Sequence, residues 1–175
     1  MRSVALLGGE SSGKTTLAVA LADALHTIWV PEYGRQLWEQ LRQTLDVPQL
    51  LHVARHQVEL EDRAAPLARG WLVCDTTPLT TLQYCLHDHG QAPPALYVLA
   101  RRRYDLQVLC LPDFGFVQDG CRRDDAFRQQ QHDWALQQLA AQGVQPVVAQ
   151  GTVQQRVQQV IVAMQHLERP ATSAG

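Results

Sequence analysis

The residues with the clearest chemical signature form a glycine-rich segment near the start of the chain. They are Gly8, Gly9, Glu10, Ser11, Ser12, Gly13, Lys14 and Thr15, and Thr16 follows them. This order matches G-x-x-x-x-G-K-[ST] at every fixed position, and it lies between an apolar run of strand length and a helical pattern, as the motif requires. Backbone N–H groups and the Lys14 ammonium can bind phosphate oxygens, and the Thr15 hydroxyl can ligate magnesium. The segment therefore predicts binding of ATP with Mg²⁺.

Lysine usage supports this interpretation of the loop. Lys14 is the single lysine among the 15 Lys and Arg residues of the chain. A drifting composition that left one lysine by accident is the alternative, but this lysine stands at the position where the motif requires it. A GTPase of the Ras type would need a second lysine in its guanine-reading N-K-x-D loop, so the composition disfavours that class.

A carboxylate beside the magnesium ion is the next requirement of P-loop chemistry, and it commonly follows a buried strand. Asp75 comes directly after the apolar run of residues 71–74 and is the natural candidate. The same side chain has a competing role as the N-cap of a helix that starts near residues 76–78. We expect Asp75 to hold Mg²⁺ together with Thr15.

Glu32 closes a second apolar run, directly after Pro31. Kinases of small molecules often place at this point the base that takes a proton from the acceptor hydroxyl. An ion pair with Arg35, one helical turn further on, is the competing role. We expect Lys14, Glu32 and Asp75 to be catalytic, with Glu32 as the base.

Arginines gather after Asp119-Gly120, where Arg122 and Arg123 precede a long helical pattern that contains Arg128. In a kinase, a mobile segment carrying arginines closes over the phosphates, excludes water and stabilises charge during transfer. The alternative is a solvated helix start. We expect Arg122 and Arg123 to act in catalysis and Arg128 to contact the nucleotide.

Two other polar clusters have weaker chemical meaning. His87-Asp88-His89 has the composition of a metal site, but a polar helix end before Gly90 explains it better. The basic run of residues 101–103 is either a phosphate patch or a solvated helix end, and we favour the helix end. The four cysteines form no C-x-x-C pair, so we expect no structural zinc.

The elements that must position these residues alternate along the chain. Short apolar runs predict strands over 3–7, 27–30, 71–74, 106–111 and 144–149. Helical patterns occupy 14–25, 34–41, 49–68, 78–87, a stretch near 95, 123–142 and 153–167. Strands that are apolar throughout and separated by helices predict an α/β fold with a five-stranded parallel sheet flanked by helices. We expect one P-loop domain over 1–168 and a disordered tail over 169–175.

Composition limits the partners. The net charge of −2 and the absence of a basic stripe argue against a nucleic-acid partner. The apolar run after Met1 is too short for a signal peptide or a membrane span, so we expect a cytoplasmic protein with no membrane partner. The oligomeric state is not predicted.

An ordered set of motifs resembles the ribosylnicotinamide kinase domain of the NAD-biosynthesis regulator NadR and related AAA-type P-loop kinases. The matching segments are residues 8–16, Val30-Pro31-Glu32-Tyr33-Gly34-Arg35, Gln57 with Glu59, Cys74-Asp75-Thr76, Tyr104-Asp105-Leu106, and Pro112-Asp113 through residues 119–122. The likeness spans almost the whole chain. The P-loop by itself is generic, and the order of the set gives the resemblance its specificity.

This resemblance implies a P-loop NTPase fold like that of nucleoside-monophosphate kinases and a specific reaction. The ATP γ-phosphate would move to the 5′-hydroxyl of nicotinamide riboside and give nicotinamide mononucleotide. Glu32 and Asp113 would suit the cationic pyridinium by charge, and Tyr33 and Phe116 by cation-π attraction. The family often has tryptophan near the place of Phe116. Two alternatives stay open, a kinase of another nucleoside or small metabolite and a regulatory module that senses ATP without turning it over.

Overall fold

Five parallel strands form one sheet with the first strand at its centre. They are β1 (Arg2–Leu7), β2 (Trp29–Val30), β3 (Trp71–Asp75), β4 (Leu106–Cys110) and β5 (Val147–Ala149), in the order β2-β3-β1-β4-β5. This computed structural model describes residues 1–116 and 123–168, so Arg122 and the predicted tail over 169–175 lie outside the described residues. The chain builds β2 and β3 on one side of β1 and β4 and β5 on the other. The carboxyl ends of the strands around such a reversal are where open α/β sheets bind ligands.

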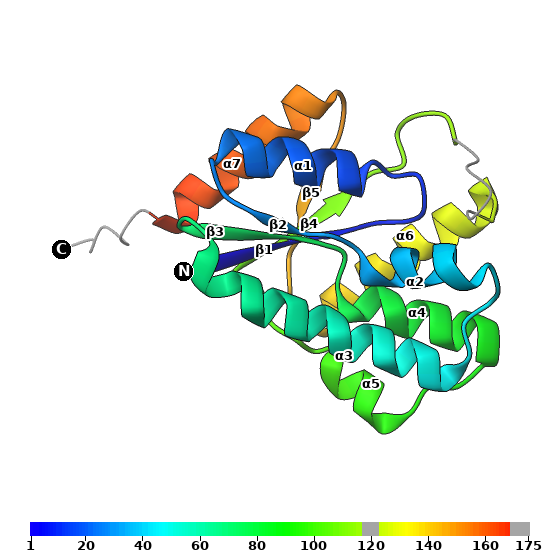
Figure 1. Ribbon diagram of the computed structural model, residues 1–175. Coiled ribbons are helices and arrows are strands. Elements are labelled where there is room, and N and C mark those ends of the chain that lie inside the picture. The colour runs from blue at the N-terminus through cyan, green and yellow to red at the C-terminus, as the bar shows by residue number, and fades with distance from the viewer. Residues whose placement is uncertain (117–122, 169–175) are drawn as a thin grey trace.

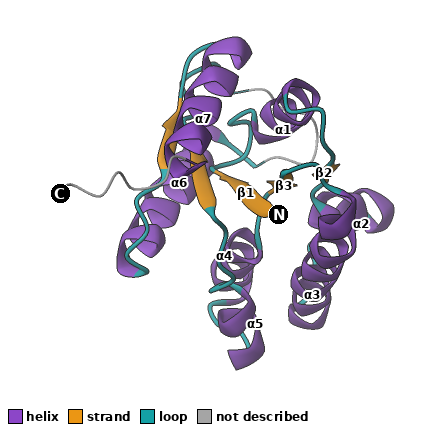
Figure 2. Ribbon diagram, turned by 90° about the vertical axis from the view of Figure 1, so that its left-hand side faces the viewer, coloured by secondary structure: helices purple, strands orange, loops and turns teal. Residues whose placement is uncertain are grey.

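Helices cover both faces of the sheet (Figure 1). One layer contains α1 (Lys14–Ala24) and α7 (Val153–Glu168); the remaining helices are α2 (Tyr33–Leu41), α3 (Val47–Ala64) with the 3₁₀ turn η1 (Ala65–Leu67), α4 (Pro78–His89), α5 (Pro94–Leu99) and α6 (Asp125–Ala141). Figure 2 shows the strands between the layers. None of the helices in the described ranges combines the length and the apolar character that a membrane span needs.

The core is divided by the sheet, because successive side chains of a strand point to opposite faces. Val4 and Leu6 of β1 pack in a cluster with residues of α1 and α7. Ala5 and Leu7 belong to a second cluster with residues of α3, α4, α5 and α6. All four side chains are at most 1% exposed, which explains why the strand is apolar at every position from Val4 to Leu7. The predicted parallel α/β fold is confirmed.

Helix α3 differs from its predicted range of 49–68 at both ends. It begins at Val47 because Asp46 and Gln49 form a capping box, with 2.8 Å from the Gln49 amide to the Asp46 side chain. It ends at Ala64, and the next turn is a 3₁₀ turn that contains Pro66. Proline has no N–H to continue an α-helical ladder, which explains the change.

The last strand is shorter than the predicted range of 144–149. The Val144 amide donates to the carbonyl of Leu139 at 2.9 Å and so closes the end of α6 instead of pairing with β4. Pro146 has no N–H to donate. Strand β5 therefore begins only at Val147.

Candidate active site

The glycine-rich loop connects β1 to α1 and depends on glycine at specific points. A Cβ at Gly8 would lie 2.7 Å from the Cys110 carbonyl oxygen, and one at Gly9 would lie 2.4 Å from the Arg128 carbonyl oxygen. Gly13 has φ +80 and forms the N-cap of α1. Only glycine combines this close approach with the left-handed backbone at no steric cost. The loop is thus held between the end of β4 and helix α6.

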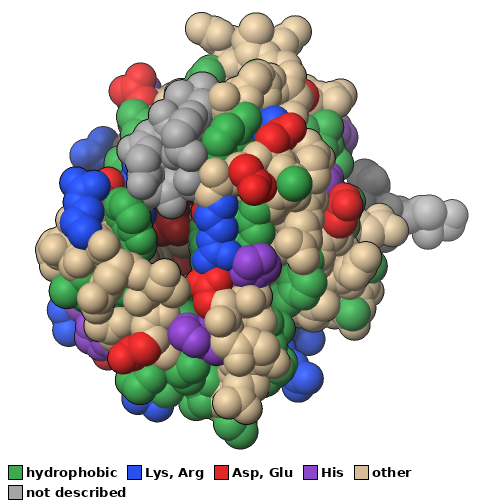
Figure 3. Space-filling view, turned by 90° about the vertical axis from the view of Figure 1, so that its right-hand side faces the viewer, with side chains coloured by type: hydrophobic (Ala, Val, Ile, Leu, Met, Phe, Trp, Pro, Cys, Tyr) green, Lys and Arg blue, Asp and Glu red, His purple; other side chains and the backbone are tan. Residues whose placement is uncertain are grey.

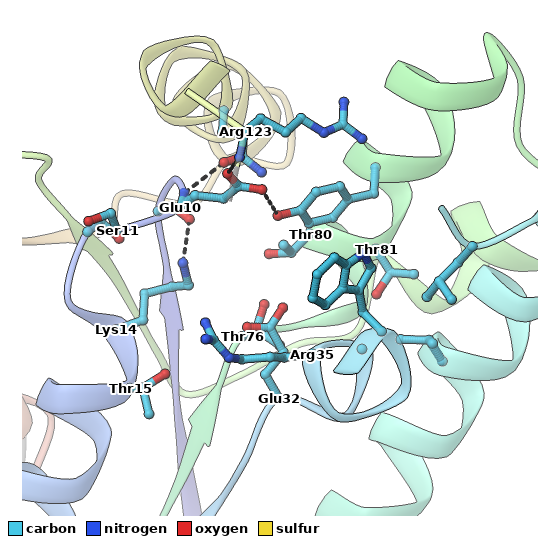
Figure 4. Close-up of a pocket in the computed structure, with 18 of the residues that line it drawn as sticks. Glu10, Ser11, Lys14, Thr15, Glu32, Arg35, Thr76, Thr80, Thr81 and Arg123 are labelled. Atoms are coloured by element: carbon cyan, nitrogen blue, oxygen red, sulfur yellow. Dashed lines mark hydrogen bonds between the residues drawn. The ribbon is translucent and has the colours of Figure 1, made fainter. Parts of the chain in front are cut away.

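Lys14 lies across this loop. Its Nζ donates to the carbonyl oxygens of Gly8 and Gly9, each at 2.9 Å, and the side chain lines a cavity (Figure 4). The two contacts hold the ammonium over the loop, in the position that the motif requires for binding phosphate oxygens.

Asp75 and Thr15 form a pair at the carboxyl end of β3. The Thr15 hydroxyl donates to Oδ2 of Asp75 at 2.6 Å, and Asp75 is 1% exposed. Oδ1 of Asp75 has no hydrogen-bond partner in the described part of the chain, and burial raises the pKa of this carboxyl. A buried oxygen without a partner is costly, and a cation would satisfy it. The pair therefore fits Mg²⁺.

The competing N-cap role belongs to another residue. Helix α4 is capped by Thr77, whose hydroxyl oxygen accepts from the Leu79 amide at 3.2 Å. Asp75 does not make that cap. Within residues 1–116 and 123–168, no cluster of three or more His, Cys, Asp or Glu side chains could hold a metal ion. Mg²⁺ at the Thr15–Asp75 pair would therefore take its remaining ligands from phosphate oxygens and water.

Glu32 follows β2 and lines the same cavity as Lys14. Burial raises the pKa of Glu32 to about 7; the positive charges of Lys14 and Arg35 oppose this shift, while Asp75 and Glu10 add to it. Arg35 also donates from Nε to Glu39 at 3.1 Å, so it serves an ion pair on its own helix as well. Labelled side chains from the loop and from α2 face one another in Figure 4. A carboxyl with a pKa near the working pH suits a general base.

The cavity measures about 350 Å³ and extends from the phosphate loop to α2, α3 and α4. Figure 3 shows this face hollowed, with basic and acidic side chains around the opening. Its lining includes Trp38, Thr80, Thr81 and Tyr84, which no motif named, and Gln57, which belongs to the matching segments but was given no role in the site. Pairs of threonines on a helix face and a tryptophan one turn and a half after Glu32 are weak signals in sequence. Their role depends on tertiary proximity.

Glu10 links the loop to three other parts of the site. Its carboxylate accepts from the Tyr84 hydroxyl at 2.8 Å and from the Arg123 amide at 2.7 Å, while its own amide donates to Gln131 Oε1 at 2.7 Å. The predicted contact of Glu10 with the nucleotide stays a prediction. Glu10 connects the loop to α4 and α6 through these hydrogen bonds.

Arg123 lines the cavity and is not a simple solvated helix start. Its guanidinium forms an ion pair with Asp88 and lies 4.4 Å from the centre of the Phe127 ring. The N-cap of α6 is another residue, Asp124, whose side chain accepts from the Phe127 amide at 2.7 Å. Arg123 therefore lies in the cavity wall with its guanidinium held by Asp88 and Phe127, and its predicted part in catalysis stays a prediction.

Arg128 lies behind the phosphate loop, and its predicted contact with the nucleotide stays a prediction. It is 4% exposed, and its Nη1 donates to the carbonyl oxygens of Phe114 at 2.9 Å and Ser11 at 3.4 Å. It also forms an ion pair with Asp125, one turn earlier on α6. Because these groups occupy its donors, Arg128 braces the phosphate loop from behind and does not line the cavity.

Three of the predicted acceptor residues are not brought to the cavity. Tyr33 packs its ring on His52 and His56. Asp113 pairs with Arg156 and accepts from the Gly151 amide at 2.6 Å. The ring of Phe116 lies 5.5 Å from the guanidinium carbon of Arg128. Each of these side chains is used by a neighbour that is distant in sequence, and Trp38 is the aromatic residue of α2 that does reach the cavity.

Sequence comparison matches residues 3–156 to the family described as AAA domain. The similar curated proteins include the trifunctional NAD biosynthesis/regulator protein NadR of Salmonella typhimurium and that of Escherichia coli. Each is 33% identical over 127 residues, which is 70% of this chain and 31% of the relative. The chain thus spans about a third of the curated relatives that it matches.

Solved structures give the same picture at the level of the fold. A NadR protein in complex with NR has a TM-score of 0.77 and 21% identity over 99% of this chain and 54% of that one. NadR in complex with NAD and AMP-PNP has a TM-score of 0.75 and 22% identity, over 95% of this chain and 49% of that one. Thymidylate kinase from Ehrlichia chaffeensis has a TM-score of 0.64 and 16% identity, over 93% and 98%. The chain shares the fold of P-loop kinases.

Proposed function

The chain belongs to the AAA domain family of P-loop proteins, and from this premise we propose that it is a kinase that phosphorylates nicotinamide riboside with ATP. One observation carries the proposal. Glu32 and Lys14 line a single cavity, so a base and a phosphate-binding ammonium flank the same space. The substrate class is supported by the similarity to NadR and by the NadR structure in complex with NR.

The residues around the cavity have separate roles in this proposal. Lys14 and the loop amides bind the outer phosphates of ATP. Thr15 and Asp75 would hold Mg²⁺, which would supply positive charge against the phosphoryl oxygens. Glu32 accepts the proton of the 5′-hydroxyl as that oxygen forms a bond to the γ-phosphorus. The bond from the γ-phosphorus to the bridging oxygen breaks, and ADP leaves with that electron pair. Arg123 faces the charge that develops during transfer.

The acceptor end of the cavity suits a cationic ring. Trp38 lines it, and tryptophan is the aromatic side chain that attracts cations best. The carboxylates of Glu10 and Glu32 line the same space and add negative charge. A pyridinium therefore has both an aromatic face and acidic neighbours within reach of the base. We propose that Trp38 takes the stacking role for which the resemblance suggested Tyr33 and Phe116.

A comparison of acceptors tests the proposal. The purified protein with magnesium-ATP is given nicotinamide riboside, adenosine, cytidine or thymidine, and kcat/KM is measured for each from the release of ADP. We expect nicotinamide riboside to exceed each neutral nucleoside by about tenfold or more, since specificity is a ratio of kcat/KM values. A neutral nucleoside that wins by tenfold would assign the chain to the kinases of other nucleosides.

A further inference from the structure

Polar side chains surround the buried carboxyl of Glu61, on α3 and in the segment that leads into β4. Glu61 is 1% exposed and has Arg102 Nε at 2.8 Å. The Tyr104 hydroxyl lies 3.0 and 3.2 Å from its two carboxyl oxygens. A carboxylate is buried in this way only when charge and hydrogen bonds compensate for the lost water. None of these residues has a part in the proposed reaction.

Gln57 connects this cluster to the cavity. It lies one helical turn before Glu61 on α3, is 2% exposed and lines the cavity. Its Oε1 accepts from the Tyr33 amide at 3.0 Å. Burial raises the pKa of the Glu61 carboxyl to about 7, and the charge of Arg102 and the neighbouring Tyr104 and Gln57 side chains oppose this shift. The buried Nε2 of Gln57 has no hydrogen-bond partner in the described part of the chain.

The chemistry of these groups orients the Gln57 amide. An ionised carboxylate only accepts hydrogen bonds, so Glu61 requires the NH₂ end of the amide on its side. The carbonyl end is then directed to the Tyr33 N–H, which is the contact that the structure has. In the opposite orientation, the Gln57 oxygen would face the Glu61 carboxylate, and the Gln57 NH₂ group would face the Tyr33 N–H. Both pairs would repel. Glu61 thus selects the orientation in which Gln57 can bind Tyr33.

The Tyr33 amide matters because of its neighbour. Tyr33 is the first residue of α2, where backbone N–H groups have no partner within the helix. The side chain of an N-cap residue usually satisfies one of them. Here the N-cap is Glu32, and its side chain makes no cap hydrogen bond. Gln57 supplies an acceptor for the first of these N–H groups from outside the helix, and the Glu32 side chain, which makes no cap, lines the cavity.

We propose that Gln57 and Glu61 are positioning residues for phosphoryl transfer: Gln57 holds the backbone beside Glu32, and Glu61 fixes the orientation of the Gln57 amide. This inference rests on the proposed role of Glu32 as the base. Displacing a catalytic group by about 1 Å can lower the rate by about a hundredfold. A residue that holds the backbone next to the base should therefore act on kcat and leave binding of magnesium-ATP unchanged.

Four variants test the proposal, with kcat and the KM for magnesium-ATP measured for each. Gln57→Leu removes the acceptor and should lower kcat by about 10- to 100-fold. Glu61→Gln removes the orienting charge and should lower kcat by about tenfold. The KM for magnesium-ATP should be unchanged in both variants. The double exchange Gln57→Glu with Glu61→Gln restores an acceptor for Tyr33 and a donor beside it, and should recover kcat to within about threefold of the parent. Asp62→Asn is the control, since Asp62 is 61% exposed and also contacts Arg102, and it should retain the parent kcat.

A second readout does not depend on activity. Hydrogen exchange of the Tyr33 amide, followed by NMR, should accelerate by about tenfold or more in Gln57→Leu and return to the parent rate in the double exchange. Unchanged exchange in Gln57→Leu, or a kcat loss that equals the fraction of protein unfolded at the assay temperature, overturns the inference. Failure of the base is separate: if Glu32→Gln keeps the parent kcat, the proposed function of Glu32 is wrong, while the amide exchange still reports whether Gln57 holds Tyr33.

Discussion

Lowering the pH should titrate the proposed base directly. Burial raises the pKa of Glu32 to about 7. A general base must be ionised to take a proton, so activity is present above this pKa and is lost as the pH falls through it. At pH 6 roughly a tenth of such a carboxyl is ionised, and at pH 8 about nine tenths is. We therefore expect kcat/KM for nicotinamide riboside, at saturating magnesium-ATP, to fall about tenfold from pH 8 to pH 6.

The assay measures ADP by chromatography at constant ionic strength, from about pH 5.5 to about pH 8.5, a range that spans the titration of the proposed base. Glu61 is the confounding group, because burial raises its pKa to about 7 as well. In Glu61→Gln the rate should be lower but should still fall below pH 7, whereas in Glu32→Gln the rate should drop by ~100- to 10,000-fold and lose this dependence. A parent rate that is flat from pH 6 to pH 8, or a pH dependence that disappears in Glu61→Gln and persists in Glu32→Gln, would refute the reasoning.

Two further substitutions separate the roles of the phosphate and metal residues. Lys14→Ala should lower kcat by about a thousandfold, because several kcal/mol of transition-state stabilisation depend on that charge. Circular dichroism should show the parent fold. A variant that keeps about a tenth of the parent rate would contradict the phosphate-binding role of Lys14. Asp75→Asn keeps the shape of the side chain and should need about tenfold more Mg²⁺ for half-maximal rate, measured by magnesium titration at fixed ATP. An unaltered response to Mg²⁺ would leave Asp75 only its hydrogen bond with Thr15.

The features that could be predicted from the sequence are those formed by residues close together along the chain. A phosphate loop is contiguous, so Gly8 to Thr15 identified it completely, and the alternation of apolar runs with helical patterns predicted the parallel sheet. Asp75 could be placed beside Thr15 because the carboxyl ends of parallel strands meet at one edge. These predictions needed only the spacing of residues along the chain.

The acceptor end of the cavity depends on contacts between distant segments. Asp113 follows β4 and has the composition of a ligand residue, yet Arg156, 43 positions later, pairs with it. Nothing in the local pattern around Asp113 indicates that partner. Trp38 and Gln57 reach the cavity because α2 and α3 pack together, and a glutamine in a helical pattern is otherwise typical of an exposed face.

The contacts of Glu61 with Arg102 and Tyr104 also join segments that are distant in sequence and could not be predicted from the local pattern. Glu61 lies between Leu60 and Asp62 in a helix with several charged residues, and its sequence neighbourhood is typical of a solvated helix. Only the approach of Arg102 and Tyr104 from the segment before β4 explains how a carboxyl can be 1% exposed there. Buried charge of this kind is read from tertiary structure and not from periodicity.

The most direct test of the central claim is the identity of the product. The protein is incubated with magnesium-ATP and nicotinamide riboside, and the mixture is followed by phosphorus NMR and mass spectrometry, with Glu32→Gln as the matched control. We predict that nicotinamide mononucleotide, phosphorylated at the 5′-oxygen, appears together with ADP in equal amounts, and that Glu32→Gln forms neither at a comparable rate. ADP release at the same rate with and without the riboside, or ADP without a phosphorylated riboside, would contradict the account.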